Sequence, residues 1–166
     1  RGQNRGRDAV GGSRMILYLD ASALVKRYVV EAGSIEVNEV VATAISTGTG
    51  IISRAEVAAA LAKAARMGAL TREEAEASLL LFRSQWADLV RIRATEALVS
   101  RADTLAWEFN LRGYDAVHLA AAALWQDSMG KPVTLATFDR LLWLAAQRLG
   151  LVPFPSDLQP FLAKSS

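Results

Sequence analysis

Cysteine is absent from the 166 residues of this chain, and histidine occurs once. Without cysteine, a disulfide framework, a thiolate metal site and a cysteine nucleophile are all excluded. The single histidine, His118, excludes a metal site built from several imidazoles. A chain without cysteine also fits a reducing compartment, and we expect the protein to be cytoplasmic.

Long apolar runs are absent as well. No run approaches the roughly 20 residues that a membrane-spanning helix needs, and the glycine-rich N-terminal residues lack the apolar stretch of a signal peptide. We therefore expect no membrane association. The composition is 52% hydrophobic and 22% charged, which is typical of a folded globular protein. A length of 166 residues is enough for one domain with a buried core.

The basic balance of the chain comes from its first residues. Residues 1–14 carry four arginines and one acid, Asp8, whereas the remainder holds 15 basic and 16 acidic residues. The pI of about 9.2 therefore gives little support for nucleic-acid binding. Because apolar structure starts at Met15, we expect residues 1–14 to be a disordered tail or a non-native extension. We expect residues 15–155 to form one domain and residues 156–166 to form a C-terminal tail.

Short apolar runs alternate with longer stretches of helical pattern, which is typical of an α/β fold with a parallel sheet. Five short strands are expected, at residues 15–19, 51–52, 89–92, 133–136 and 151–152. About seven helices are expected, at residues 21–30, 35–46, 55–67, 72–86, 95–110, 115–127 and 137–148. The pattern contains no repeat and no linker, so it predicts a single domain.

Four acidic residues stand where this pattern places strand ends or helix starts: Asp20, Glu56, Asp115 and Asp139. The carboxyl ends of parallel strands meet at one edge of a sheet, so these residues can converge there. Carboxylates that lie close together repel one another and favour a bound cation. Oxygen ligands suit Mg²⁺ or Mn²⁺ rather than zinc. Such a site can support phosphodiester hydrolysis, because these ions orient a phosphate and activate water.

Each acid also has a purely structural explanation. Residues 53–56 have the form of a capping box, in which the glutamate bonds only to the backbone, and residues 71–74 have the same form. Asp115 and Asp139 suit the positive end of a helix, and Asp20 can cap the helix that follows it. The apolar run before Asp20 and the convergence of four acids favour a shared metal pocket over separate caps.

Basic residues accompany the acids along the chain: Lys26, Arg54, Arg112 and Arg140. Three of them lie near expected helix starts, where a cation opposes the helix dipole. Contact with a nucleic-acid backbone and surface solubility are both open explanations for them.

At these residues the sequence resembles the PIN-domain nucleases, and most closely the VapC toxins of bacterial toxin–antitoxin pairs. The matching segments are residues 18–28 (YLDASALVKRY) with Glu31 and residues 33–34, residues 52–57 (ISRAEV), residues 113–120 (GYDAVHLA) and residues 135–141 (LATFDRL). They occur in the order that the family shows and span nearly all of residues 15–152.

The resemblance implies a PIN-like αβα three-layer sandwich and a Mg²⁺-dependent endoribonuclease that cleaves RNA. It also implies a homodimer and neutralisation by a VapB-like antitoxin. Carried over to this sequence, it makes Asp20 and Asp115 the principal metal ligands. Glu56 and Asp139 complete the catalytic set, binding the metal directly or through water.

Three further polar residues match the family pattern. Ser22 and Thr137 match hydroxyls beside the first and last acids, where they can hold water next to the metal, although each also fits a plain helix N-cap. His118 lies one helical turn after Asp115, where a hydrogen-bonded structural histidine is the simplest interpretation.

Other functions fit the sequence less well. A phosphatase with Asp20 as nucleophile normally has a second aspartate two residues later, where this chain has Ser22. A receiver-type signalling domain needs an adjacent acid pair and a late lysine after a strand, and neither is visible. A non-catalytic PIN-like RNA-binding or scaffold module is the main alternative. Such modules usually lose one or more of the acids, whereas all four are present here.

Overall fold

The computed structural model describes residues 14–162 of the chain. Residues 1–13 of the expected N-terminal tail and residues 163–166 of the expected C-terminal tail lie outside the described residues. Within them, five strands form one parallel sheet in the order β3-β2-β1-β4-β5. The strands are β1 (Ile16–Leu19), β2 (Ser46–Gly50), β3 (Val90–Ile92), β4 (Val133–Ala136) and β5 (Val152–Phe154).

Seven α-helices connect and cover these strands in the described part of the chain. They are α1 (Ala21–Leu24), α2 (Ser34–Thr43), α3 (Ser53–Arg66), α4 (Arg72–Gln85), α5 (Glu96–Phe109), α6 (Gly113–Met129) and α7 (Arg140–Arg148). Short 3₁₀ turns occupy Val25–Arg27, Trp86–Asp88 and Gln159–Phe161. Between residues 14 and 162, no helix combines the length and apolar character needed to cross a membrane.

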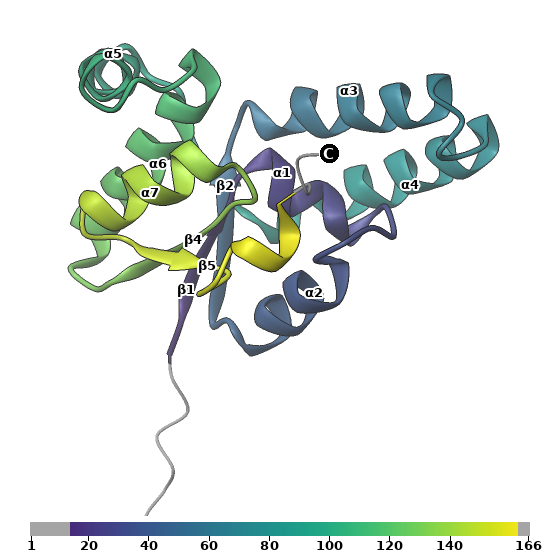
Figure 1. The fold of residues 1–166 in the computed structure, drawn as a ribbon, viewed down its shortest axis with the longest axis horizontal. Coiled ribbons are helices and arrows are strands. Elements are labelled where there is room, and N and C mark those ends of the chain that lie inside the picture. The colour runs from purple at the N-terminus through teal and green to yellow at the C-terminus, as the bar shows by residue number, and fades with distance from the viewer. Residues whose placement is uncertain (1–13, 163–166) are drawn as a thin grey trace, which may run out of the picture.

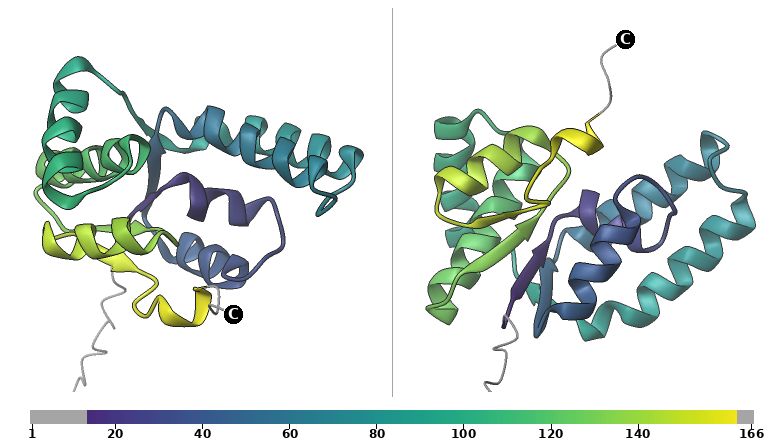
Figure 2. Two further views of the ribbon diagram at one scale, coloured as in Figure 1. Left: turned by 45° about the horizontal axis from the view of Figure 1, so that its top comes forward. Right: turned by 60° about the horizontal axis from the view of Figure 1, so that its bottom comes forward.

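Side chains of β1 alternate between two hydrophobic cores, as the period of a strand requires. Ile16 and Tyr18 pack with α5, α6 and α7 on one face of the sheet. Leu17 and Leu19 pack with α1, α2, α3 and α4 on the other face. Figures 1 and 2 show the sheet between these two helical layers, with the α3–α4 hairpin extending to one side. The expected αβα sandwich, with five short strands and seven helices, is confirmed.

The second strand differs from the sequence prediction. Ile51 and Ile52 form a turn, and β2 is the preceding segment Ser46–Gly50, which contains no apolar side chain. This strand is central, between β1 and β3, and has small side chains because its neighbours are close. A Cβ atom at Gly48 would lie 2.8 Å from the ring of Trp125. The expectation was wrong because burial here depends on tertiary neighbours and not on hydropathy.

Several helix ends also differ from the prediction. Helix α7 begins at Arg140 with Asp139 as its N-cap, so Thr137 is not a cap. Helix α6 begins at Gly113, two residues earlier than expected. The expected helix at residues 21–30 is the single turn α1 followed by a 3₁₀ turn. The capping box at residues 71–74 is confirmed, with both reciprocal hydrogen bonds present.

The order of the strands creates a crevice at the carboxyl ends of β1 and β4. From β1 the chain passes to β2 on one side, whereas β4 pairs with β1 on the other side. Connections leave in opposite directions at such a point, and open α/β sheets bind ligands there. Asp20 directly follows β1, and residues 137–139 directly follow β4. The fold therefore brings two predicted site segments to one place.

Candidate active site

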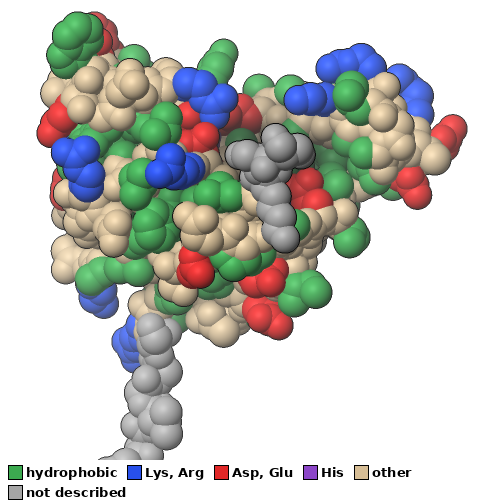
Figure 3. Space-filling view, in the orientation of Figure 1, with side chains coloured by type: hydrophobic (Ala, Val, Ile, Leu, Met, Phe, Trp, Pro, Cys, Tyr) green, Lys and Arg blue, Asp and Glu red, His purple; other side chains and the backbone are tan. Residues whose placement is uncertain are grey.

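The four predicted acids line one pocket of about 260 Å³ at these strand ends. Its other lining residues are Ala21, Ser22, Arg112, His118 and Phe138. Figure 3 shows acidic and basic side chains next to each other in this region, between α7 and α3. Segments that are 36, 59 and 24 residues apart in the sequence therefore meet, as the strand-end pattern predicts.

Asp20 lies at the bottom of the pocket and is 3% exposed. Its Oδ1 accepts hydrogen bonds from the Ser22 hydroxyl at 2.7 Å and from the Ala23 N–H at 2.8 Å. Its Oδ2 accepts from the Thr137 hydroxyl at 2.6 Å. Asp20 is thus the N-cap of α1, but the cap uses only one of its oxygens. The capping interpretation is confirmed and does not account for the hydroxyl on the other oxygen.

Burial raises the pKa of the Asp20 carboxyl above its usual value. The nearby His118 and the hydrogen bonds from Thr137, Ser22 and the Ala23 backbone oppose this rise. A buried carboxylate repays its lost hydration only through such donors or through a cation. The arrangement therefore favours a positive ligand at Asp20.

Glu56 reaches the pocket from the first turn of α3, and its partner is not the backbone. The expected capping box at residues 53–56 is absent, because Ser53 lies inside the helix and its hydroxyl is 2.7 Å from that of Thr49. Instead, Glu56 Oε1 lies 2.7 Å from Nε2 of His118. Nδ1 of the same ring lies 2.8 Å from the hydroxyl of Tyr18. The structural explanation for Glu56 was wrong.

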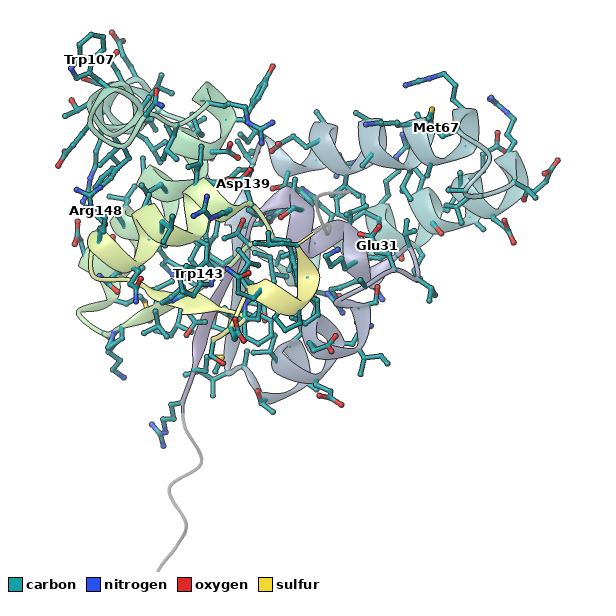
Figure 4. All side chains as sticks on the ribbon, in the orientation of Figure 1. Glu31, Met67, Trp107, Asp139, Trp143 and Arg148 are labelled. Carbon is teal, nitrogen blue, oxygen red and sulfur yellow. The ribbon has the colours of Figure 1, made fainter. Side chains whose placement is uncertain are left out.

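Asp115 and Asp139 form the outer side of the pocket and share one basic partner. Arg112 Nε donates to Asp115 Oδ2 at 3.0 Å, and Arg112 Nη2 donates to Asp139 Oδ2 at 3.1 Å. The Arg112 side chain is 74% exposed. Figure 4 places Asp139 at the start of α7, next to α1, where its Oδ1 caps α7 through the Leu142 N–H at 2.9 Å.

Partial burial raises the pKa of Asp115, and the Asp139 carboxylate adds to this rise. Hydrogen bonding to Arg112 lowers it in part. Among residues 14–162, no three Asp, Glu or His side chains are grouped closely enough to hold a metal ion as they stand. At the outer acids, the position between the two carboxylates is taken by the Arg112 guanidinium.

The other basic residues singled out from the sequence have local partners or point to solvent. Lys26 pairs with Glu31 at 3.0 Å and lies 4.4 Å from the centre of the Phe138 ring. Arg54 lies 5.6 Å from the Trp86 ring, and Arg140 is exposed at the start of α7. Of the four, Arg112 is the one that contacts the predicted acids in the described structure.

Comparison with known proteins adds a family to this geometry. The chain is 34% identical, over 146 residues, to the proteins named ribonuclease VapC45 and ribonuclease VapC49 of Mycobacterium tuberculosis. The matched region is 87% of this chain and 99% of each relative. The chain belongs to the VapC ribonuclease family. No protein-family model matches it.

Solved structures share the fold of this VapC-family chain. PAE2754 from Pyrobaculum aerophilum is 20% identical with a TM-score of 0.60, over 93% of this chain and all of that one. VapBC2 from Rickettsia felis, bound to a promoter DNA fragment, is 16% identical with a TM-score of 0.56, over 84% and 97% of the two chains. FitAcB from Neisseria gonorrhoeae is 17% identical with a TM-score of 0.55, over 84% and 96%.

The two hydroxyls that match the VapC pattern contact the first acid. Ser22 and Thr137 both donate to Asp20, and each also accepts a backbone N–H, from Phe138 and Asp139 respectively. Neither is a helix N-cap, so that alternative was wrong. Tyr18 was not identified from the sequence as part of the site. Its position two residues before Asp20 could have pointed to the site, but an aromatic residue in an apolar strand is explained equally well by packing in the core.

Proposed function

We propose that this chain is a Mg²⁺-dependent endoribonuclease that hydrolyses RNA phosphodiester bonds at the pocket of Asp20, Glu56, Asp115 and Asp139. The observation that carries the proposal is the convergence of these carboxylates on one pocket, in a chain 34% identical to proteins named ribonucleases. We further propose that it is the toxin of a type II toxin–antitoxin pair and acts in the cytoplasm. A non-catalytic RNA-binding module would have no need of four converging acids.

The donor set of the pocket fits a hard divalent cation. Its ionisable ligands are carboxylates, and the one imidazole already contacts Glu56. Oxygen donors of this kind suit Mg²⁺, with Mn²⁺ as a substitute. We place the ion on Asp20 and Asp115, with Glu56 and Asp139 binding it directly or through water. When bound, the ion would orient the scissile phosphate and offset its developing charge.

The protein's own residues prepare the pocket for this role. Ser22, Ala23 and Thr137 fix both oxygens of Asp20, so one carboxylate keeps its orientation before any ligand arrives. The outer acids already attract a cation, the guanidinium of Arg112. Once displaced, that flexible and exposed side chain is close enough to meet a phosphate of the RNA backbone.

Cleavage of a synthetic single-stranded RNA by the purified chain tests the proposal. We expect internal cuts in the presence of MgCl₂, no cuts in EDTA, and recovery with MnCl₂. Asp115→Asn should lose this cleavage, and Asp127→Asn, which alters an exposed acid paired with Arg101, should retain it. Cleavage that continues unchanged in EDTA, or in purified Asp115→Asn, would contradict the proposal.

We also propose two protein partners, a VapB-like antitoxin and a second copy of this chain. The resemblance to VapC toxins implies both, and VapBC2, a solved structure with the same fold, supports the antitoxin. Co-expression with a cognate VapB-like antitoxin should give a stable complex that no longer cuts RNA. Light scattering of the isolated chain should give about twice its mass of 17.9 kDa, and a monomer would contradict the dimer.

A further inference from the structure

A line of hydrogen bonds leads from the protein core to the acidic pocket. Tyr18 on β1 contacts His118 on α6 at 2.8 Å, and His118 contacts Glu56 on α3 at 2.7 Å. Tyr18 is 0% and His118 1% exposed, whereas the Glu56 side chain is 26% exposed. The line therefore links three separate elements and ends at a carboxylate that lines the pocket.

The sequence around Tyr18 makes room for this contact. A Cβ atom at Gly50 would lie 2.8 Å from the Tyr18 hydroxyl, so a side chain there would displace it. The Tyr18 and His118 rings also pack edge to face, with centroids 5.9 Å apart and an interplanar angle of 71°.

Both ring nitrogens of His118 have a hydrogen-bonding partner. In the tautomer that carries its proton on Nε2, His118 donates to the Glu56 carboxylate. The hydroxyl of Tyr18 faces Nδ1 of the same ring. The ring is thus held at both nitrogens and cannot turn without breaking both hydrogen bonds, of which the one to Tyr18 is buried.

We propose that Tyr18 and His118 are positioning residues that hold the Glu56 carboxylate in the orientation required to bind the divalent ion. This inference rests on the proposed function and assigns roles to two residues outside the set of four acids. Groups that orient a metal ligand through hydrogen bonds commonly change metal affinity by about 10-fold to 100-fold when they are removed. The effect should therefore appear in metal binding itself and not only in RNA cleavage.

Mn²⁺ binding measured by isothermal titration calorimetry tests the proposal with two matched tyrosine variants. Tyr18→Phe removes the hydroxyl that contacts His118. Tyr28→Phe removes a hydroxyl that donates to Gln85 at 2.7 Å, in the opposite helical layer and away from the pocket. We expect Tyr18→Phe to weaken Mn²⁺ binding about 10-fold and Tyr28→Phe to leave it unchanged.

Two further comparisons separate positioning from general damage to the fold. In a Glu56→Ala background, Tyr18→Phe should cause no additional loss of Mn²⁺ affinity, because its effect passes through Glu56. His118→Gln keeps an N–H donor for Glu56 and should bind Mn²⁺ more tightly than His118→Leu. His118 is the only histidine, so ¹⁵N-histidine labelling reports one ring. Its Nε2–H signal should be protected from exchange in the native chain and in Tyr28→Phe, but not in Tyr18→Phe.

The outcomes distinguish this inference from the function on which it rests. If the native chain binds Mn²⁺ and cuts RNA while Tyr18→Phe binds Mn²⁺ as well as Tyr28→Phe does, positioning is overturned and the nuclease stands. A Tyr18→Phe effect that persists in full without Glu56 also overturns it. A native chain that binds no Mn²⁺ overturns both. Thermal melting of each variant tests whether it is folded. Because Tyr18→Phe keeps the buried ring, it still tests the proposal if His118→Leu does not fold.

Discussion

The pocket has two halves that are held together in different ways. The inner half is Asp20 and Glu56, whose partners are hydroxyls, a backbone N–H and a buried imidazole. The outer half is Asp115 and Asp139, which share the guanidinium of Arg112. Asp20 is 3% exposed, whereas the Arg112 side chain is 74% exposed.

This difference determines which half can change shape. Removing one partner of a buried polar group costs about 1–3 kcal/mol, because the group that remains is left unpaired. An exposed ion pair is worth about 0–1 kcal/mol and weakens in salt. Asp20 in the inner half is therefore fixed by folding before any ligand binds, and the outer half can release Arg112 at little cost. A divalent ion would meet Asp20 and Glu56 on one side, and on the other Asp115 and Asp139, whose shared partner Arg112 is exposed and can be displaced.

The largest effect is expected at the inner half, from Asp20→Asn. The amide keeps the shape of the carboxyl and can still accept from Ser22 and Ala23, so the fold should persist. The missing charge should lower RNA cleavage at least about 100-fold, the scale typical of losing one electrostatic contact to developing charge. Single-turnover cleavage of a labelled RNA measures this. Cleavage within a fewfold of the native rate would show that the inner half is not the catalytic centre.

A second comparison tests whether Thr137 matters through Asp20 or only through the core. Thr137 and Thr49 are both 0% exposed. Thr137 donates to Asp20, whereas Thr49 donates to the Leu19 carbonyl oxygen at 2.6 Å. Replacing either by Val should destabilise the fold by about 1–3 kcal/mol in urea unfolding. Thr137→Val alone should also weaken Mn²⁺ binding about 10-fold, and equal Mn²⁺ affinities in the two variants would remove Thr137 from the site.

In the outer half, removing the basic partner of the acids should strengthen Mn²⁺ binding instead of weakening it. Arg112→Gln removes the cation that occupies the space between Asp115 and Asp139, so a divalent ion no longer has to displace it. Mn²⁺ binding should tighten about fivefold at low ionic strength, the equivalent of one exposed ion pair worth about 1 kcal/mol. The gain should shrink as salt is added, and the midpoint of thermal unfolding should hardly move. Weaker Mn²⁺ binding in Arg112→Gln would mean that the guanidinium supports the ion instead of competing with it.

The central strands differ in hydrophobicity, and this decided which of them could be predicted from the sequence. β1 and β4 are short, mainly apolar runs, and the sequence pattern located both. β2 was misplaced because Ser46–Gly50 has only small and polar side chains, and its burial follows from the strands on either side. A strand of this kind cannot be recognised without its neighbours.

The site was predictable to the extent that strand ends determine it. The positions of Asp20 and Asp139 follow directly from β1 and β4, and all four acids do line one pocket, although their catalytic role stays a prediction. The pairing of each acid did not follow from the sequence. The contact between Tyr18 and His118 spans 100 residues, and the bridge from Arg112 to Asp139 spans 27. Such pairs depend on packing that local patterns do not encode.

The smallest expected effect is on the pH dependence of the free energy of unfolding, which again should differ between the two halves. Burial raises the folded-state pKa of Asp20 above its ordinary value of 3.8. The stability that this shift contributes is fully present below pH 3.8 and is lost as pH rises through the folded-state pKa. Asp20→Asn does not titrate, so in metal-free buffer its free energy of unfolding should improve relative to the native chain as pH rises from 4 to 7.

The free energy of unfolding of Asp115→Asn should also improve relative to the native chain as pH rises, because the pKa of Asp115 is raised too, first by its partial burial. Here Arg112 opposes the rise in the pKa while the charge of Asp139 adds to it, and added salt screens both charges. The pH dependence of the stability difference between Asp115→Asn and the native chain should therefore change with ionic strength, whereas that of Asp20→Asn should stay nearly constant. Urea unfolding across pH at two salt concentrations measures both. Equal salt responses would mean that the two halves of the pocket are not distinct, because salt screens the charges beside the exposed Arg112 more than it screens the buried Asp20.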